Sequence, residues 1–165
     1  MADSSVLIAL SAIGQLRVIC ARFPEGVLVP SAVWREVVEE GRDRPGAREI
    51  STAQWISMGQ IKDNAFVQYL RMGLDDGEAE AIGLAREVNA GLVLLDERAA
   101  RDVAKGLGLK VLGTIGLLIW AKRAGRVKNL RQLLDRLQDE ANFRIGKTVY
   151  ATALQEADEQ TENTP

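Results

Sequence analysis

The run Leu92-Val93-Leu94-Leu95, followed at once by Asp96, contains the clearest strand signal in the chain. Four consecutive apolar residues of this kind are typical of a strand that is buried on both faces, as in a parallel sheet covered by helices. Asp96 then lies at the carboxyl end of that strand, where parallel α/β sheets bind their ligands. A carboxylate there is costly to bury without a cation or hydrogen-bond partners. Asp96 is therefore a ligand of a bound group or the N-cap of the following helix, and the two roles are compatible.

Helical and strand-like segments alternate on both sides of this run. Further short strands are expected at residues 27–29, 55–56 and 110–112. Helices are expected over residues 6–12, 31–40, 74–88, 98–107, 114–124, 129–140 and 146–156. This alternation predicts an α/β fold, a three-layer α/β/α sandwich with a mainly parallel central sheet. We place one domain at residues 1–156 and a disordered, acidic and polar tail at residues 157–165.

Composition narrows the class of protein. The chain has 165 residues, of which 47% are hydrophobic and 27% are charged, as expected for one globular domain. It contains no histidine, which excludes Ser-His and Cys-His hydrolases and zinc sites built on imidazole. Any catalysis therefore depends on carboxylates, lysine, hydroxyl groups or an oxygen-ligated metal. The sequence has no membrane-spanning apolar run and no basic region of a signal peptide, so we expect a cytoplasmic protein without membrane contact.

Charge is distributed unevenly along the chain. Residues 1–96 carry 9 basic and 14 acidic side chains, whereas residues 97–155 carry 12 basic and 5 acidic ones. This asymmetry suits a protein that binds a polyanion and holds cations, although a helical surface rich in arginine and lysine also explains it. Candidates for contact with a nucleic-acid backbone are Ser5 and the N–H groups at Gly113-Thr114, where a strand meets a helix. A basic set is a further candidate for this contact: Lys122, Arg123, Arg126, Lys128 and Arg131. The alternative is that the basic residues form a solvated face.

Three further carboxylates occupy positions near strand ends or packed helix faces. Asp3 follows what we expect to be the end of a first strand, and Ser5 places a hydroxyl group beside it. Glu78 lies near the start of the helix that begins at residue 74, although negative charge there also suits the helix dipole. Glu36 lies beside apolar residues of the helix that follows the second strand. Converging carboxylates repel one another unless a divalent cation neutralises them, so the pattern favours an oxygen-ligated Mg²⁺ or Mn²⁺ site, as in metal-dependent phosphodiesterases.

These acidic segments, in this order and spacing, resemble those of PIN-domain proteins. The segments that carry the resemblance are Ala2–Leu10, Pro30–Val37, Leu74–Ile82 and Leu94–Arg101. The run from Gly108 to Gly125 narrows the match to a prokaryotic PIN-like subgroup, whose members are often described as nucleic-acid-binding proteins or as toxins of toxin–antitoxin pairs. No single segment is specific, but five of them together cover about residues 2–155, which is essentially the whole domain.

The resemblance implies a three-layer α/β/α fold and an Mg²⁺- or Mn²⁺-dependent endoribonuclease that acts as the toxin of such a pair. Carried over position by position, it implies the catalytic set Asp3, Glu36, Glu78 and Asp96, with Ser5 as a hydroxyl partner. Asp3, Glu78 and Asp96 would be the metal ligands. The metal would activate water for in-line attack on a phosphodiester, and Glu36 and Glu78 would hold a second metal or orient that water. The implied partners are an RNA substrate, an antitoxin protein and a second copy of the chain.

Two positions depart from the PIN pattern. Most PIN proteins have four or five apolar residues before the first Asp, whereas only Met1 and Ala2 precede Asp3 here. The nearby α-amino group would then compete with a metal. The third acidic position is Glu78, where many relatives have Asp, and the longer side chain loosens the site. We therefore expect weak activity from the chain as encoded.

Two alternatives remain open from the sequence. The chain is a PIN-like module with a weak or inactive site that binds nucleic acid or an antitoxin without cleavage. The other alternative is a phosphoacceptor domain of the response-regulator type that uses Asp96, Thr114 and Lys122. The absence of a paired Asp-Asp at the end of the first strand argues against this alternative. If Trp34 and Trp55 are exposed, they indicate a partner surface or a homodimer, and both also suit the core.

Overall fold

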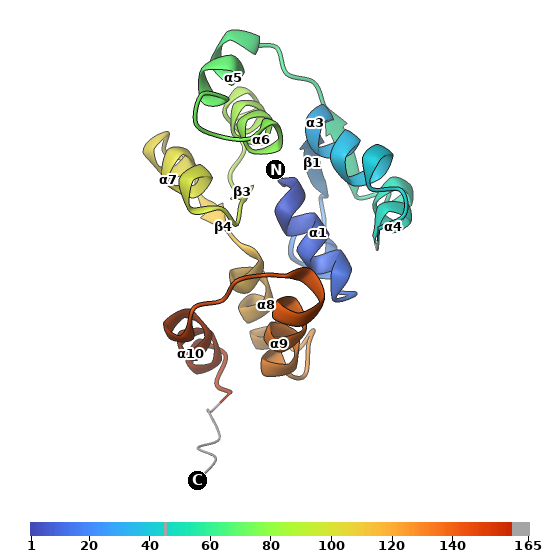
Figure 1. The fold of residues 1–165 in the computed structure, drawn as a ribbon, viewed down its shortest axis with the longest axis vertical. Coiled ribbons are helices and arrows are strands. Elements are labelled where there is room, and N and C mark those ends of the chain that lie inside the picture. The colour runs from blue at the N-terminus through green and yellow to red at the C-terminus, as the bar shows by residue number, and fades with distance from the viewer. Residues whose placement is uncertain (45, 160–165) are drawn as a thin grey trace.

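The computed structural model describes residues 1–44 and 46–159. The chain begins with α1 (Ser4–Ala12), α2 (Arg17–Arg22), β1 (Val27–Pro30), α3 (Ser31–Trp34), the π-helix η1 (Arg35–Glu40), α4 (Ala47–Thr52) and β2 (Ile56–Gly59). It continues with α5 (Asn64–Leu70), α6 (Asp76–Glu87), β3 (Val93–Leu94), α7 (Arg98–Gly106), β4 (Val111–Leu112), α8 (Thr114–Arg123), α9 (Leu130–Ala141) and α10 (Lys147–Glu156). Helices surround a small group of central strands (Figure 1).

The N-terminal residues join two short pairs of parallel strands into one layer. β1 pairs with β2, and β3 pairs with β4, both in parallel. Between the pairs, the N–H of Ala2 donates to the carbonyl oxygen of Leu28 at 3.0 Å. On the other side, the N–H of Leu94 donates to the carbonyl oxygen of Met1 at 2.8 Å, and that of Asp3 donates to Leu94 at 3.1 Å. Residues 1–3 therefore occupy the central strand position, so the expected first strand is present and very short.

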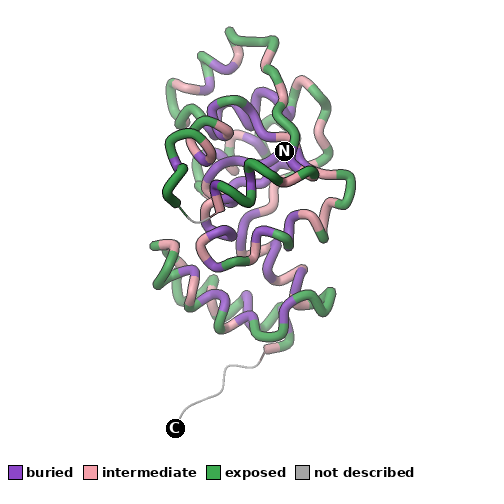
Figure 2. The backbone as a smooth tube through the Cα atoms, turned by 90° about the vertical axis from the view of Figure 1, so that its right-hand side faces the viewer, coloured by how far each residue is buried: buried purple, intermediate pink, exposed green. Residues whose placement is uncertain are grey.

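Strand residues alternate between two hydrophobic cores on opposite faces of this layer. Leu94 belongs to the core that contains α1, α2, α8 and α9, whereas Val93 and Leu95 belong to the core that contains α5, α6 and α7. Because successive side chains of a strand point to opposite faces, the two cores are the two interlayer spaces of an α/β/α sandwich. Buried residues accordingly follow the inside of the molecule in Figure 2. The predicted fold class is confirmed, although each regular sheet has only two strands.

The C-terminal helices extend the first core and hold the last described residues. Ala157 is buried after the end of α10. The Glu159 carboxylate accepts the N–H of Leu130 at the start of α9 and forms an ion pair with Lys122 of α8. Residues 157–159, which the sequence analysis assigned to a disordered tail, thus pack on the domain. Residues 160–165 of that tail lie outside the described residues.

Most expected strands and helices are present with ends shifted by a few residues, but three helices were not expected. These are α2, α4 and α5, which contain six, six and seven residues. Helices this short contain too few apolar residues to show a helical period, and isolated helices of this length are marginal in water. Their formation therefore depends on packing against the rest of the domain.

The two tryptophans considered for a partner surface, Trp34 and Trp55, are not fully exposed. Trp34 and Trp55 are half-buried and pack against the first core, so they do not form an exposed partner surface. The large hydrophobic side chains that are exposed instead include Tyr69 and Met72. Within residues 1–44 and 46–159, no helix is both long and apolar enough to cross a membrane.

Candidate active site

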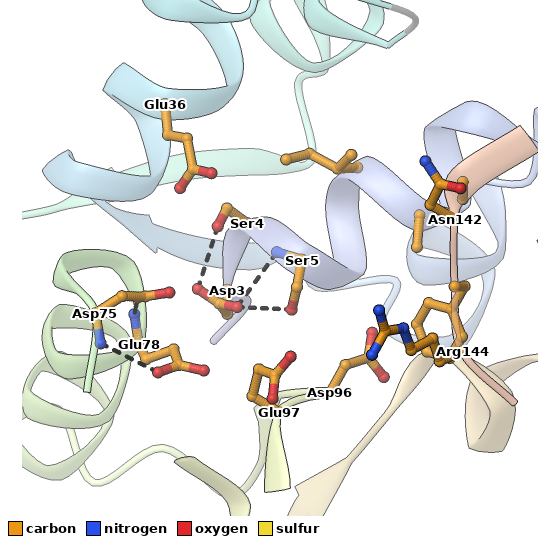
Figure 3. Close-up of a pocket in the computed structure, with 14 residues that line it drawn as sticks. Asp3, Ser4, Ser5, Glu36, Asp75, Glu78, Asp96, Glu97, Asn142 and Arg144 are labelled. Atoms are coloured by element: carbon orange, nitrogen blue, oxygen red, sulfur yellow. Dashed lines mark hydrogen bonds between the residues drawn. The ribbon is translucent and has the colours of Figure 1, made fainter. Parts of the chain in front are cut away.

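An acidic pocket of about 780 Å³ lies where the central strands end (Figure 3). Its acidic lining residues are Asp3, Glu36, Asp75, Glu78, Asp96 and Glu97. They come from the end of the first strand, η1, the start of α6 and the end of β3. Parallel strands bring their carboxyl ends to one edge of a sheet, which explains this convergence. The structure thus brings all four sequence-predicted carboxylates into one pocket.

Asp3 is fixed at the start of α1, where it is the N-cap. Its Oδ2 atom accepts the N–H of Ser5 at 3.2 Å and the hydroxyl of Ser5 at 2.7 Å. Its side chain is buried, and a Cβ at Gly77 of α6 would lie 3.0 Å from Oδ1. Burial raises the pKa of Asp3 most, the hydrogen bonds from Ser5 and Ser4 lower it, and the charge of Asp75 raises it. Asp3 is therefore a desolvated carboxyl group whose charged form a nearby cation would stabilise.

Glu78 belongs to the first turn of α6, where it forms a capping box with Asp75. The N–H of Glu78 donates to Asp75 at 2.8 Å, and the N–H of Asp75 donates to Glu78 Oε2 at 3.2 Å. The other oxygen, Oε1, is buried and has no hydrogen-bond partner among the described residues. Burial, with the charges of Asp75 and Asp3, raises the pKa of Glu78 to about 7. The capping box holds one oxygen and leaves the other free to bind a group in the pocket.

Asp96 is oriented by the first residue of α8. The N–H of Thr114 donates to Asp96 at 2.8 Å and the Thr114 hydroxyl donates at 2.6 Å. Burial raises the pKa of Asp96, whereas these two hydrogen bonds and the charge of Arg101 lower it. A Cβ at Gly113 would lie 2.8 Å from Asp96 Oδ1, so glycine permits this close approach. Asp96 does not cap α7, because the N-cap of that helix is Glu97.

Glu36 approaches the pocket from the π-helix η1. The side chain is half-buried, and it has no hydrogen bond or ion pair with another described residue. The sequence predicted an ordinary helix here, whereas residues 35–40 adopt the wider π form. π-Helical turns are rare and frequently occur at functional sites. Glu36 is thus an unengaged carboxylate on the wall opposite Asp96 (Figure 3).

Three residues that the sequence suggested for nucleic-acid contact have other partners. Thr114 is fully buried, and both its polar groups bind Asp96. Lys122 donates to the carbonyl oxygen of Lys128, in addition to its ion pair with Glu159. Arg123 Nε donates to the carbonyl oxygen of Glu156 at 2.7 Å. None of the three lines the pocket, because the junction before α8 faces Asp96 and the end of α8 faces the C-terminal segment.

The pocket is also lined by residues that the sequence motifs did not single out. Asp75 lies three residues before Glu78, and Glu97 directly follows Asp96. The motifs could therefore have indicated that both side chains lie near the pocket. Arg144 lines the wall formed by the segment between α9 and α10. No local pattern marks Arg144, because its position depends on how these two helices pack.

The α-amino group of Met1 is directed away from the carboxylates. Met1 lies two residues before Asp3, and its α-amino group donates to the carbonyl oxygen of Leu92 at 3.2 Å. Burial lowers the pKa of this amine to about 6, so it is mostly uncharged at neutral pH. The amine therefore does not supply the competing positive charge that the short strand suggested.

The residues present fit an oxygen-ligated divalent cation. The six acidic lining residues offer only carboxylate oxygens, which suit Mg²⁺ and Mn²⁺. The unpartnered buried oxygen of Glu78 is a donor that a cation would satisfy. Within residues 1–44 and 46–159, no three such side chains are gathered closely enough to form a ready-made metal group.

Comparisons with known proteins identify the family. A family model described as a PIN domain matches residues 1–159, which include every strand, every helix and the acidic pocket. No curated protein and no solved structure shows significant similarity to the chain. With nearly the whole chain matched, and with the sequence-predicted carboxylates in one pocket at the strand ends, the chain belongs to the PIN-domain family.

Proposed function

We propose that this PIN domain is an Mg²⁺- or Mn²⁺-dependent endoribonuclease whose active site is the acidic pocket. PIN domains are generally nucleases. The observation that carries the proposal is the buried Oε1 of Glu78, which has no partner among the described residues and lies in a pocket with five other carboxylates. A desolvated set of this kind is unfavourable alone and becomes favourable with a cation.

Each carboxylate has a distinct role in this proposal. Asp3, Glu78 and Asp96 would hold the cation, since they are the more buried members and are fixed by Ser5, Asp75 and Thr114. When bound, a divalent cation stabilises negative charge on a phosphodiester. Glu36 is unengaged and would orient the attacking water, for which its carboxylate accepts a hydrogen bond. The hydroxyl of Ser5 holds Asp3 in place, and its hydrogen bond offsets part of the rise in the pKa of Asp3 that burial causes.

The first test is cleavage of labelled single-stranded RNA with Mn²⁺, in the presence and absence of a chelator. We expect cleavage that the chelator abolishes and that Asp96→Asn reduces by a factor of about 100 or more. Asp139→Asn makes the same chemical change on the exposed face of α9 and should leave cleavage unchanged. Cleavage that persists in the chelator or in folded Asp96→Asn would contradict the proposal.

We further propose that the chain is the toxin of a toxin–antitoxin pair, acting in the cytoplasm with an antitoxin protein as its partner. The support is the resemblance of residues 2–155 to PIN proteins of that type. Induced expression in a bacterial host should arrest growth, whereas Asp96→Asn should not. Normal growth with full-length, cleavage-competent protein present would contradict the toxin role.

A second candidate is a PIN module that binds nucleic acid or a protein partner without cleavage. The observation in its favour is that no three acidic side chains in the described part of the chain are gathered as a metal group. Calorimetry separates the two candidates. A nuclease should take up Mn²⁺ in the wild type and lose that uptake in Asp3→Asn, whereas an inactive module should show no uptake in either protein.

A further inference from the structure

Arg144 is the cationic side chain of an otherwise acidic pocket. Fourteen residues line the pocket, and among them Arg144 faces six carboxylates. A nucleic-acid backbone that enters must place its phosphates beside these carboxylates, which repel it. A bound cation compensates this repulsion at one point of the pocket. The guanidinium group offers a second, fixed positive charge at another point.

The backbone before Arg144 directs this residue toward the pocket. The C-cap of α9 is Asn142, which has a left-handed conformation with φ of 51°, and the N–H of Phe143 donates to the carbonyl oxygen of Leu137. This reversal turns the segment 142–146 back over the strand ends, so that Arg144 points into the pocket in Figure 3. Asparagine tolerates the left-handed region better than most residues.

The guanidinium group of Arg144 is available to a ligand. Arg144 is exposed and has no hydrogen bond or ion pair with any residue of the described part of the chain. Lys122 and Arg123, by contrast, are occupied by backbone carbonyls and by Glu159. An arginine that lies beside carboxylates yet pairs with none of them is free to donate two parallel hydrogen bonds to a phosphate.

A second pocket continues the path beyond Arg144. It is lined by Gln138, Asn142, Phe143, Arg144, Ile145 and Gly146, so the two pockets meet at residues 142–144. Phe143 packs against the first core, which gives this junction a fixed edge. A strand that lies across the carboxylates can therefore run on past Arg144 into the second pocket.

We propose that Arg144 binds a backbone phosphate next to the scissile one. The inference rests on the proposed function of the acidic pocket. The exposed guanidinium group lies where the two pockets meet, so a nucleic-acid strand that crosses the carboxylates and continues into the second pocket passes beside it. Arg144 is a substrate-binding residue in this view, and its contact with phosphate is independent of base sequence.

The test compares Arg144→Ala, Arg144→Lys and Arg17→Ala, the last an exposed arginine that lines neither pocket. Binding of a fluorescent ten-nucleotide single-stranded RNA is measured by anisotropy with Mn²⁺ present, so that a cation offsets the carboxylates, and with a cleavage-resistant phosphorothioate backbone that keeps the negative charges. We expect Arg144→Ala to weaken binding by a factor of about 10 and to reduce the slope of log K against log salt by about 0.7. Arg144→Lys should restore part of the affinity, and Arg17→Ala should match the wild type.

Cleavage assays with Mn²⁺ then separate this inference from the proposed function. Arg144→Ala should raise KM with a smaller effect on kcat. If RNA binding depends on Arg144 but no cleavage occurs, the phosphate contact stands and the nuclease proposal fails. If Arg144→Ala binds RNA like Arg17→Ala, or the wild type binds no RNA, the inference is overturned whatever the activity.

Discussion

At the level of single residues, the acidic pocket contains carboxyl groups whose charged form is disfavoured by burial. Burial raises the pKa of Asp3, Glu78 and Asp96, and hydrogen bonds from Ser5 and Thr114 offset part of this effect for two of them. Glu78 differs because its unpartnered oxygen leaves burial and nearby negative charge dominant. The pocket therefore favours bound protons or a bound cation over free carboxylates.

The raised pKa of Glu78 predicts how the stability of the metal-free protein depends on pH. The neutral acid is the form favoured by the folded state, so its contribution is fully present below about pH 4.5 and is lost as pH rises through about 7. Between these values the wild type should lose on the order of 2 kcal/mol more unfolding free energy than Glu78→Gln. Urea unfolding in chelator, at several pH values, measures this. Parallel pH profiles for the two proteins would contradict the assignment.

Thr114 provides a second prediction at this scale. Thr114→Val removes the 2.6 Å hydrogen bond to Asp96 while keeping the shape of the buried side chain. We expect the variant to lose about 1–3 kcal/mol of unfolding free energy in chelator and to raise the pKa of Asp96 further. Thr114→Ser keeps the hydroxyl and should retain most of both properties. Denaturant unfolding and the pH dependence of Mn²⁺ binding report the two effects.

At the scale of elements, the ends of helices position the site. α1 begins at the capping residue Asp3, α6 begins with the capping box of Glu78, and α8 begins with the Thr114 groups that hold Asp96. The first N–H groups of a helix have no partner within the helix, so carboxylates accept hydrogen bonds from them. These hydrogen bonds therefore cap the helix and also hold the carboxylates of the pocket in place. The sequence indicated the starts of these helices, but it did not show that Thr114 faces Asp96, since 18 residues separate them.

Gly113 offers a prediction at the scale of this junction. Its φ of −106° suits any residue, so the effect of Gly113→Ala is steric rather than conformational. The new Cβ would lie 2.6 Å from Arg101 Nη1 and 2.8 Å from Asp96 Oδ1, and it should displace the carboxylate. We expect Mn²⁺ affinity to fall by a factor of about 10 or more. Gly106→Ala in α7 meets no atom within 4 Å and should leave metal binding unchanged in the same calorimetric titration.

At the scale of the whole molecule, the C-terminal helices tie the basic half of the chain to the acidic half. α8, α9 and α10 pack together below the strands in Figure 1, and the segment between α9 and α10 reaches back to the pocket. Glu159 joins the segment after α10 to α9 and α8, because its carboxylate accepts the N–H groups of Leu130 and Arg131 and forms an ion pair with Lys122. The position of Arg144 thus depends on the packing of the C-terminal helices.

Glu159→Ala tests this connection. The variant should lose about 1–2 kcal/mol of unfolding free energy, because two N–H groups at the start of α9 lose their acceptor and Lys122 loses its ion pair. Hydrogen exchange should become faster in α10, whereas exchange in α6 should not change. Glu156→Ala, which removes an exposed side chain nearby, serves as the control. Unchanged stability and exchange in Glu159→Ala would show that residues 157–159 do not anchor the domain.

Several features of the chain could be predicted from its sequence alone: the fold class, and the edge of the sheet at which the four predicted carboxylates lie. The absence of histidine, the strand before Asp96 and the carboxylates at strand and helix ends all follow from local composition and period. Local patterns determine such features because they depend on neighbours along the chain. The strand and helix order predicted the α/β/α sandwich for the same reason.

Which side chains face one another became clear from the three-dimensional packing alone. It placed residues 1–3 between two strand pairs, left Glu78 Oε1 without a partner among the described residues, and directed Thr114 to Asp96 rather than to solvent. It also brought Arg144, which lies near the other end of the sequence from Asp3, to the same pocket. These features depend on packing between elements that are distant in sequence, and no local period records the direction of a side chain across such a gap.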